Sequence, residues 1–88
     1  MQYLSDTTMC GILAKVQEIQ PIALKRGYSF HLDASVHNWD DESHISINVA
    51  VFYDNLLVHS YDFYGHETEE QAIALVAKIR ADVVALNG

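Results

Sequence analysis

The sequence predicts an α+β fold, a two-layer α-β-β-β-α sandwich in which a three-stranded antiparallel meander carries both helices on one face. Apolar residues recur every three or four positions near both ends of the chain, which is typical of amphipathic helices. The middle of the chain instead alternates apolar and polar side chains, as half-buried strands do. With 88 residues, the chain is expected to form one domain over 1–88, because chains this short do not divide into two cores.

The first helix is predicted to begin at the capping residues 5–8, whose side-chain oxygens suit an N-cap. Pro21 is expected to stop or kink this helix. Residues 22–24 can add one short turn before Gly27, which suits a C-cap. The apolar stripe of the first helix consists of Met9, Ile12, Leu13, Val16 and Ile19.

Two alternating segments, 28–37 and 44–53, predict the first hairpin. The polar loop between them carries Trp39 and three acidic residues. When His37 is placed opposite His44, each apolar side chain meets an apolar partner, which indicates the correct register. The resulting pairs are Val36 with Ile45, Ala34 with Ile47, Leu32 with Val49, and Phe30 with Val51.

The third strand, 56–64, admits two registers. A two-residue turn at 54–55 places Asp62 in the core and leaves Tyr61 and Phe63 on the outer face, beside other apolar side chains. One extra loop residue exchanges the two faces. The residues that then face the core are Leu57, His59, Tyr61 and Phe63, while Ser60 and Asp62 lie outside. We favour the second register, because burying a carboxylate costs more than burying an imidazole.

The last helix is predicted to follow Gly65. Thr68 and Gln71 fit a capping box, and the acidic residues around them suit the positive end of a helix. Its apolar stripe consists of Ile73, Val76, Ile79, Val83 and Leu86.

This order of elements resembles the topology of double-stranded-RNA-binding domains. That family reads RNA with a basic cluster at the start of its last helix and with a basic or His-bearing loop near its first strand. Here the helix begins His66-Glu67-Thr68-Glu69-Glu70, and the loop contains Asp40-Asp41-Glu42. Both positions carry the wrong sign of charge. The chain has five Lys and Arg against twelve Asp and Glu, a net charge of −7, so we expect no direct nucleic-acid binding.

The single cysteine predicts the compartment. Cys10 cannot form an intramolecular disulfide, which favours a reducing, cytoplasmic setting. The first residues lack the basic start and apolar run of a signal peptide, and no window holds the roughly twenty apolar residues of a membrane span. We therefore expect a soluble protein with no membrane partner, in which Cys10 fills the core.

The five histidines suggest a metal site only weakly. His37 and His44 face each other across the hairpin beside acidic residues, and imidazole with carboxylate suits a divalent ion. The simpler interpretation is a solvated hairpin tip. No glycine-flanked nucleophile and no phosphate-binding glycine loop is found in the sequence, so we predict no catalytic residue and no cofactor.

The sequence favours a small acidic, non-enzymatic interaction or accessory domain. We expect it to form a homodimer or to bind a protein partner through the outer sheet face or the edge of the third strand. Trp39 is a candidate contact residue, and Phe52, Tyr61 and Phe63 join it if the first register holds. Two alternatives are an acidic mimic of nucleic acid that occupies a basic groove, and a small-ligand or metal-binding domain.

Overall fold

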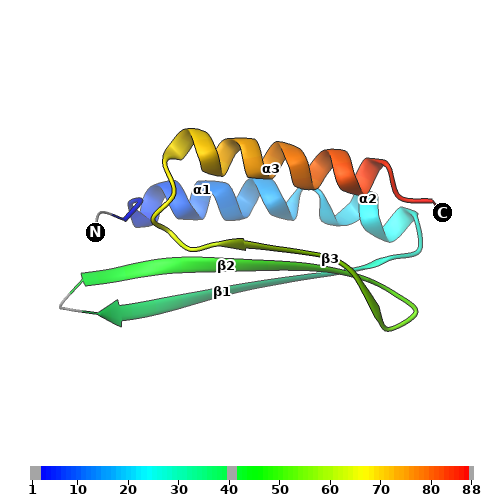
Figure 1. Ribbon diagram of the computed structural model, residues 1–88, viewed down its shortest axis with the longest axis horizontal. Coiled ribbons are helices and arrows are strands. Elements are labelled where there is room, and N and C mark those ends of the chain that lie inside the picture. Colours follow the sequence, from blue (N-terminus) through cyan, green and yellow to red (C-terminus); the bar gives the residue numbers. More distant parts are fainter. Residues whose placement is uncertain (1–2, 40–41, 88) are drawn as a thin grey trace.

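The computed structural model describes residues 3–39 and 42–87. The elements follow in the order α1 (Asp6–Gln17), α2 (Gln20–Lys25), β1 (Ser29–Trp39), β2 (Glu42–Tyr53), β3 (Leu56–Phe63) and α3 (Glu69–Val84). The strands form one antiparallel sheet in the order β1-β2-β3, which confirms the predicted α+β meander. Figure 1 shows the helices as one layer over one face of this sheet. Among the described residues, no helix has the length and apolar character needed to cross a membrane.

The predicted caps are present at both long helices. The Ser5 hydroxyl accepts a hydrogen bond from the Thr8 backbone N–H at 3.1 Å and so begins α1. Thr68 and Gln71 form the predicted capping box of α3, with reciprocal hydrogen bonds of 3.1 and 3.0 Å. Pro21 lies in the first turn of α2, where its missing N–H has no helical partner to lose.

The core lies between the helices and the central strand. Ile47, Val49 and Val51 of β2 are at most 1% exposed, because α1 and α3 cover this stretch of the strand. The helices contribute Met9, Ile12, Val16 and Ile19 from the first segment and Ala72, Val76, Ile79 and Val83 from α3. The prediction that Ile73 belongs to the apolar stripe of α3 is wrong, because Ile73 is 53% exposed and Ala72 is buried instead. Fully burying each aliphatic side chain contributes about 1.5–3 kcal/mol, so this strip accounts for much of the stability.

The first hairpin has the predicted register. His37 lies opposite His44, and the apolar pairs follow, from Val36 with Ile45 through the rest of the series. The pairing runs without interruption from Ser29 opposite Phe52 to Trp39 opposite Glu42.

The third strand combines parts of both predicted registers. A two-residue turn joins Tyr53 to Leu56, as in the first register. A β-bulge then follows, because Phe52 pairs with Leu57 whereas Val51 pairs with His59, which leaves Val58 as the extra residue. From the bulge onward the strand keeps the favoured register. The expectation that Leu57 joins the core is wrong, because the extra residue lies in the strand and not in the loop.

Both ends of the sheet lie away from the helices. Val36 belongs to the core-facing side of β1 by its pairing, yet 74% of it is exposed. At the other end of the sheet, Leu56 is 70% exposed. Figure 1 shows the β1–β2 hairpin projecting past the helical layer at one end and the β2–β3 hairpin curling away from it at the other.

Gly65 joins β3 to the rest of the fold at a point where a side chain does not fit. Its φ is +94°, and a Cβ atom there would lie 2.9 Å from the carbonyl oxygen of Ile45. Its own carbonyl accepts a hydrogen bond from the Leu4 N–H at 2.7 Å, so the N-terminal segment is held against this turn. Tyr3 then stacks on the His44 ring at 4.0 Å between centroids.

Deletion of Val58 is expected to preserve the fold. The two-residue turn and the core register are then compatible with a regular hairpin, so the free energy of unfolding should change by about 1 kcal/mol or less. Deletion of Ala50 is the control, because it exchanges the faces of half of β2 against both neighbours and should abolish cooperative unfolding. Thermal unfolding followed by circular dichroism separates the two. Loss of the cooperative transition on deletion of Val58 would contradict the bulge.

Gly65→Ala is expected to lower the free energy of unfolding by about 2–3 kcal/mol, because the new Cβ meets a backbone oxygen and φ is positive. Gly11→Ala is the matched control. Gly11 lies within α1, where an added methyl group would point into open space, and the change should raise the free energy of unfolding by about 1 kcal/mol. Urea unfolding measures both, and equal effects would count against the close approach at Gly65.

Candidate functional site

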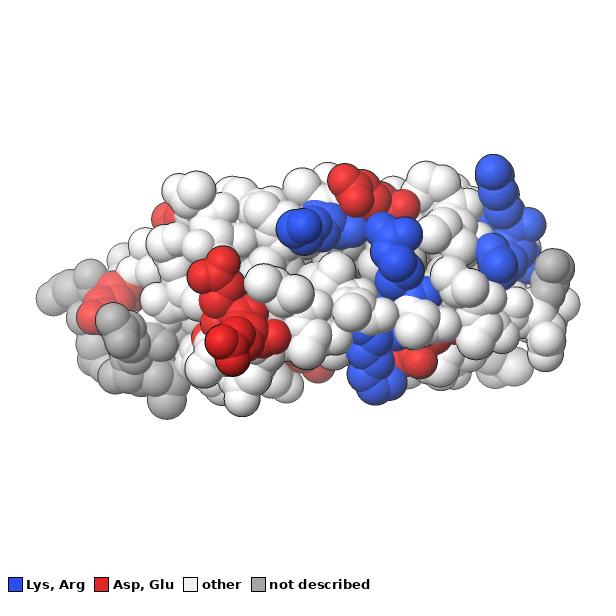
Figure 2. Space-filling model, turned by 90° about the horizontal axis from the view of Figure 1, so that it is seen from above, with Lys and Arg blue, Asp and Glu red and all other residues white. Residues whose placement is uncertain are grey.

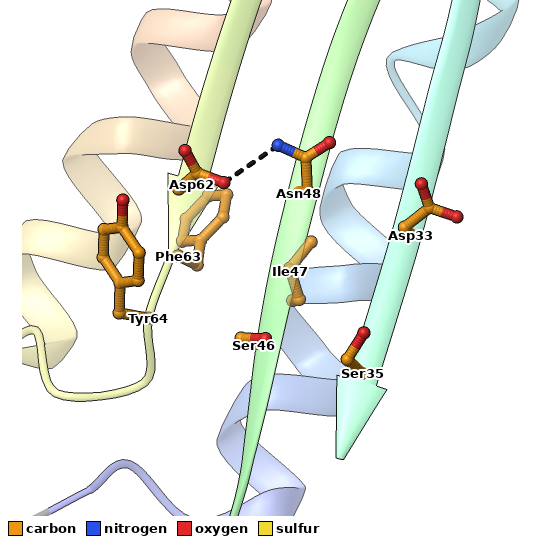
Figure 3. Close-up of a pocket in the computed structure, with 8 residues that line it drawn as sticks. All are labelled: Asp33, Ser35, Ser46, Ile47, Asn48, Asp62, Phe63 and Tyr64. Carbon is orange, nitrogen blue, oxygen red and sulfur yellow. Dashed lines mark hydrogen bonds between the residues drawn. The ribbon is translucent and has the colours of Figure 1, made fainter. Parts of the chain in front are cut away.

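A polar pocket lies on the outer face of the sheet, away from the helices. Asp33 comes from β1, Asn48 from β2 and Asp62 from β3, so the pocket crosses all three strands (Figure 3). Asn48 Nδ2 donates to Asp62 Oδ1 at 2.9 Å and to the Tyr61 carbonyl oxygen at 3.3 Å. The complete lining is Asp33, Ser35, Ser46, Ile47, Asn48, Asp62, Phe63 and Tyr64. Carboxylates and hydroxyls dominate, so this surface suits a hydrogen-bond donor such as a Lys or Arg side chain.

Positive charge is confined to the helical layer. Residues 28–64 contain no Lys or Arg, and the five such residues of the chain are Lys15, Lys25, Arg26, Lys78 and Arg80. Figure 2 shows Lys and Arg spread over the helical side, with acidic side chains in separate groups among them. The sheet therefore presents carboxylates and imidazoles without a competing cation.

The two histidines considered as metal ligands lie together, as their pairing requires. The His37 and His44 rings stack with centroids 5.2 Å apart, and His37 Nε2 is 2.9 Å from Ser46 Oγ. His44 is 6% exposed. Within 3–39 and 42–87, no three His, Cys, Asp or Glu side chains form a group able to hold a metal ion. Asp40 and Asp41 lie outside these ranges, so the weak metal site remains a prediction.

Tyr61 and Phe63 belong to the core, because the bulge turns both side chains toward the helices. They are 8% and 0% exposed, so the outer-face patch expected from the first register loses both of these residues. The Tyr61 hydroxyl donates to Asp82 Oδ2 at 2.7 Å, and Lys78 Nζ donates to the same oxygen at 2.8 Å. Burial, followed by the contact with Asp82, raises the pKa of the Tyr61 hydroxyl. The hydrogen bonds from Lys78 and Tyr61 lower the pKa of the Asp82 carboxyl.

Apolar side chains gather instead at the end of the β2–β3 hairpin. We call this surface the hairpin-end patch, and its members are Phe52, Tyr53, Leu56, Leu57 and Val58. Leu56, Leu57 and Tyr53 are 70%, 58% and 53% exposed. Phe52 is half-buried, and the centroids of the Phe52 and His31 rings lie 4.8 Å apart.

The hairpin turn is too short to fold back over this patch. Asp54 and Asn55 have φ angles of 50° and 66°, which is the left-handed conformation of tight two-residue turns. Of the predicted contact residues, Phe52 is the one placed here. Sequence reasoning missed Leu56 and Val58, although three consecutive apolar residues after a turn break the alternation and could have indicated an exposed bulge.

Two other predicted features, Cys10 and Trp39, have different outcomes. Cys10 is exposed, so the expectation that it fills the core is wrong. Cys10 comes directly after the buried residue Met9. Side chains of consecutive helix residues point in different directions, so Cys10 is exposed although Met9 is buried. The contact role of Trp39 depends on its side chain, which lies outside the described part of the structure.

The acidic-mimic alternative requires six carboxylates to share one surface, those of Asp40, Asp41, Glu42, Glu67, Glu69 and Glu70. Glu67 instead accepts hydrogen bonds from the backbone N–H groups of Tyr64 and Gly65, both at 2.8 Å, and so stabilises a local turn. Asp40 and Asp41 are outside the described residues. The mimic therefore remains a prediction.

Comparison with protein-family models, with curated proteins and with solved structures gave no match to this chain. Function is therefore inferred from the contacts, exposure and charges of the described residues.

Tyr61→Phe is expected to lower the free energy of unfolding at pH 7 by about 1 kcal/mol, since one hydrogen bond to a charged acceptor is lost while Asp82 keeps Lys78. Because folding raises the pKa of Tyr61, the stabilisation is complete below pH 10 and is lost as the pH rises further. The difference between the wild type and the variant should therefore shrink between pH 9 and 11. Tyr53→Phe, at an exposed position, should differ little from the wild type at either pH. Urea unfolding checks this, and a constant difference across this range would contradict it.

Proposed function

We propose that this chain is a protein-binding domain whose contact surface is the hairpin-end patch, at the start of the edge strand β3. The observation that supports this most directly is the exposure of Leu56, Leu57 and Tyr53, each more than half accessible on two adjacent strands. By their pairing, Tyr53 and Leu56 lie on one face of the hairpin, and Leu57 lies on the other with Phe52. The hairpin end is therefore apolar on both faces, and monomeric proteins rarely expose large apolar side chains so close together without a contact to make.

Most of these side chains make few contacts in the folded monomer, although the centroids of the Tyr53 and Tyr28 rings lie 5.0 Å apart. The core lies between the helices and the middle of β2, and none of Tyr53, Leu56 and Leu57 belongs to it. Covering one leucine on binding contributes about 1.5–3 kcal/mol, so two leucines and a tyrosine supply about 4.5–9 kcal/mol before the entropic cost of association, and further contacts along β3 add to this.

The partner should be an apolar segment flanked by Lys or Arg. β3 is an edge strand, so an extended segment can add to it by backbone hydrogen bonds while its apolar side chains cover Leu56 and Leu57. Asp54 lies in the turn beside the patch and Asp62 lies further along β3, and no Lys or Arg is present on the sheet. Basic residues on the partner would complement these charges and speed the encounter. The single exposed thiol of Cys10 suits a reducing compartment such as the cytoplasm.

Peptide display tests this proposal and does not require an identified partner. A random library is selected on the wild type, and the selected peptides are measured by calorimetry on the wild type and on the double variant Leu56→Ser/Leu57→Ser. We expect peptides that combine aliphatic or aromatic residues with Lys or Arg. Their Kd should rise at least tenfold on the variant, which corresponds to about 1.4 kcal/mol or more.

The matched control is Ile73→Ser/Val84→Ser, which removes two apolar residues of α3 that are 53% and 50% exposed. Binding should be unchanged on it, and both double variants should keep the wild-type circular dichroism. Peptides that bind the hairpin variant as tightly as the wild type would contradict the proposal, as would equal losses on the two double variants.

A further inference from the structure

The free edge of β1 lacks the features by which natural sheets prevent their edge strands from pairing with another strand. β1 is the outermost strand on its side, has 11 residues, and contains no Lys, Arg or Pro. Its pairing with β2 is continuous, whereas the opposite edge, β3, is 8 residues long and bulged. Natural sheets usually protect a long edge with lysine, proline, a bulge or a short strand. Of the two edges, β1 is therefore the less protected one and offers the longer uninterrupted stretch for pairing with another strand.

The second half of β1 is also bare on the side that faces the helices. α2 packs against the first part of the strand, where Phe30 is 8% exposed. Further along, Ala34 is exposed and Val36 is the most exposed large apolar residue of the described chain, at 74%. Two copies can therefore approach through these second halves without a collision between their α2 helices.

The charges of β1 favour one symmetric register. His31, Asp33 and His37 are its titratable side chains, and all three lie on the outer face by their alternation. An antiparallel two-fold pairing centred on Ser35 places Asp33 opposite the partner subunit's His37, twice by symmetry. On the other face, Ala34 meets the partner subunit's Val36. Centring on Asp33 would instead bring two carboxylates together, which is unfavourable for directly opposed strand residues.

We propose that the protein forms a two-fold homodimer through antiparallel pairing of β1 with β1, which joins the two sheets into one of six strands. The outer edges of that sheet are the two β3 strands, so both hairpin-end patches stay open. The dimer uses a different surface from the proposed function and does not depend on it. The two surfaces should therefore fail independently under mutation.

Light scattering coupled to size-exclusion chromatography, over 1–500 µM, tests the dimer. The wild type should approach twice the 9.9 kDa chain mass at the higher concentrations. Val36→Lys should stay near the monomer mass throughout with unchanged circular dichroism, because it places a cation in the centre of the contact at an exposed position. Leu56→Lys, at a site 70% exposed on the other end of the sheet, is the control and should dimerise like the wild type.

A charge exchange tests the register. His37→Glu places a carboxylate opposite the partner subunit's Asp33 and should weaken dimerisation at least tenfold. The double variant Asp33→Lys/His37→Glu should restore it, because opposite charges then face each other. A wild type that remains monomeric at 500 µM, or a Val36→Lys variant that still dimerises, overturns the proposal. Failure of the double variant to recover overturns the pairing centred on Ser35.

Discussion

A strand spans more length per residue than a helix does, and this difference decides how much of the sheet the helices can cover. A strand residue covers about 3.4 Å and a helix residue 1.5 Å, so the 12 residues of β2 span roughly 40 Å while the 16 residues of α3 span roughly 24 Å. The helical layer covers the middle of the sheet, where Ile47, Val49 and Val51 are buried. The sheet consequently continues past the helices at the β1–β2 end, where Val36 is exposed. At the other end the β2–β3 hairpin curls away from the helices, which exposes Leu56.

The bulge at Val58 decides which side of β3 faces the helices. It allows a tight turn at Asp54 and Asn55 together with burial of Tyr61 and Phe63. The bulge also leaves Asp62 on the outer face of the sheet, where its carboxylate accepts a hydrogen bond from Asn48. The outer sheet face is therefore polar in its middle and apolar at the hairpin end, which restricts the candidate contact surface to a small region.

The β1–β2 hairpin could be predicted from the sequence residue by residue, because strict alternation on both strands allows one register that matches apolar partners. The capping box of α3 was likewise predictable, since its signal is local. The bulge could not be located in this way. The run Leu56-Leu57-Val58 breaks the alternation, but an extra residue in the loop and one in the strand have the same effect on Asp62.

Exposure at the sheet ends was equally beyond sequence reasoning. Alternation assigns Val36 to the core face, and it does lie opposite Ile45, yet its burial depends on where the helices end in space. Tyr61 and Phe63 were candidate contact residues only in the first register. The bulge gives this part of β3 the favoured register instead, so both side chains fill the core.

Residue-resolved amide hydrogen exchange at low and high protein concentration tests most directly the claim that the uncovered ends of the sheet are contact surfaces. At low concentration, amides of residues 47–51 should be strongly protected, and those of 33–37 and 53–58 should exchange much faster. At high concentration, residues 33–37 should gain protection. The exchange of residues 53–58 should stay unchanged, because these residues take no part in the proposed dimer. Strong protection of both ends in the dilute protein would contradict this account, as would protection that does not respond to concentration anywhere in the sheet.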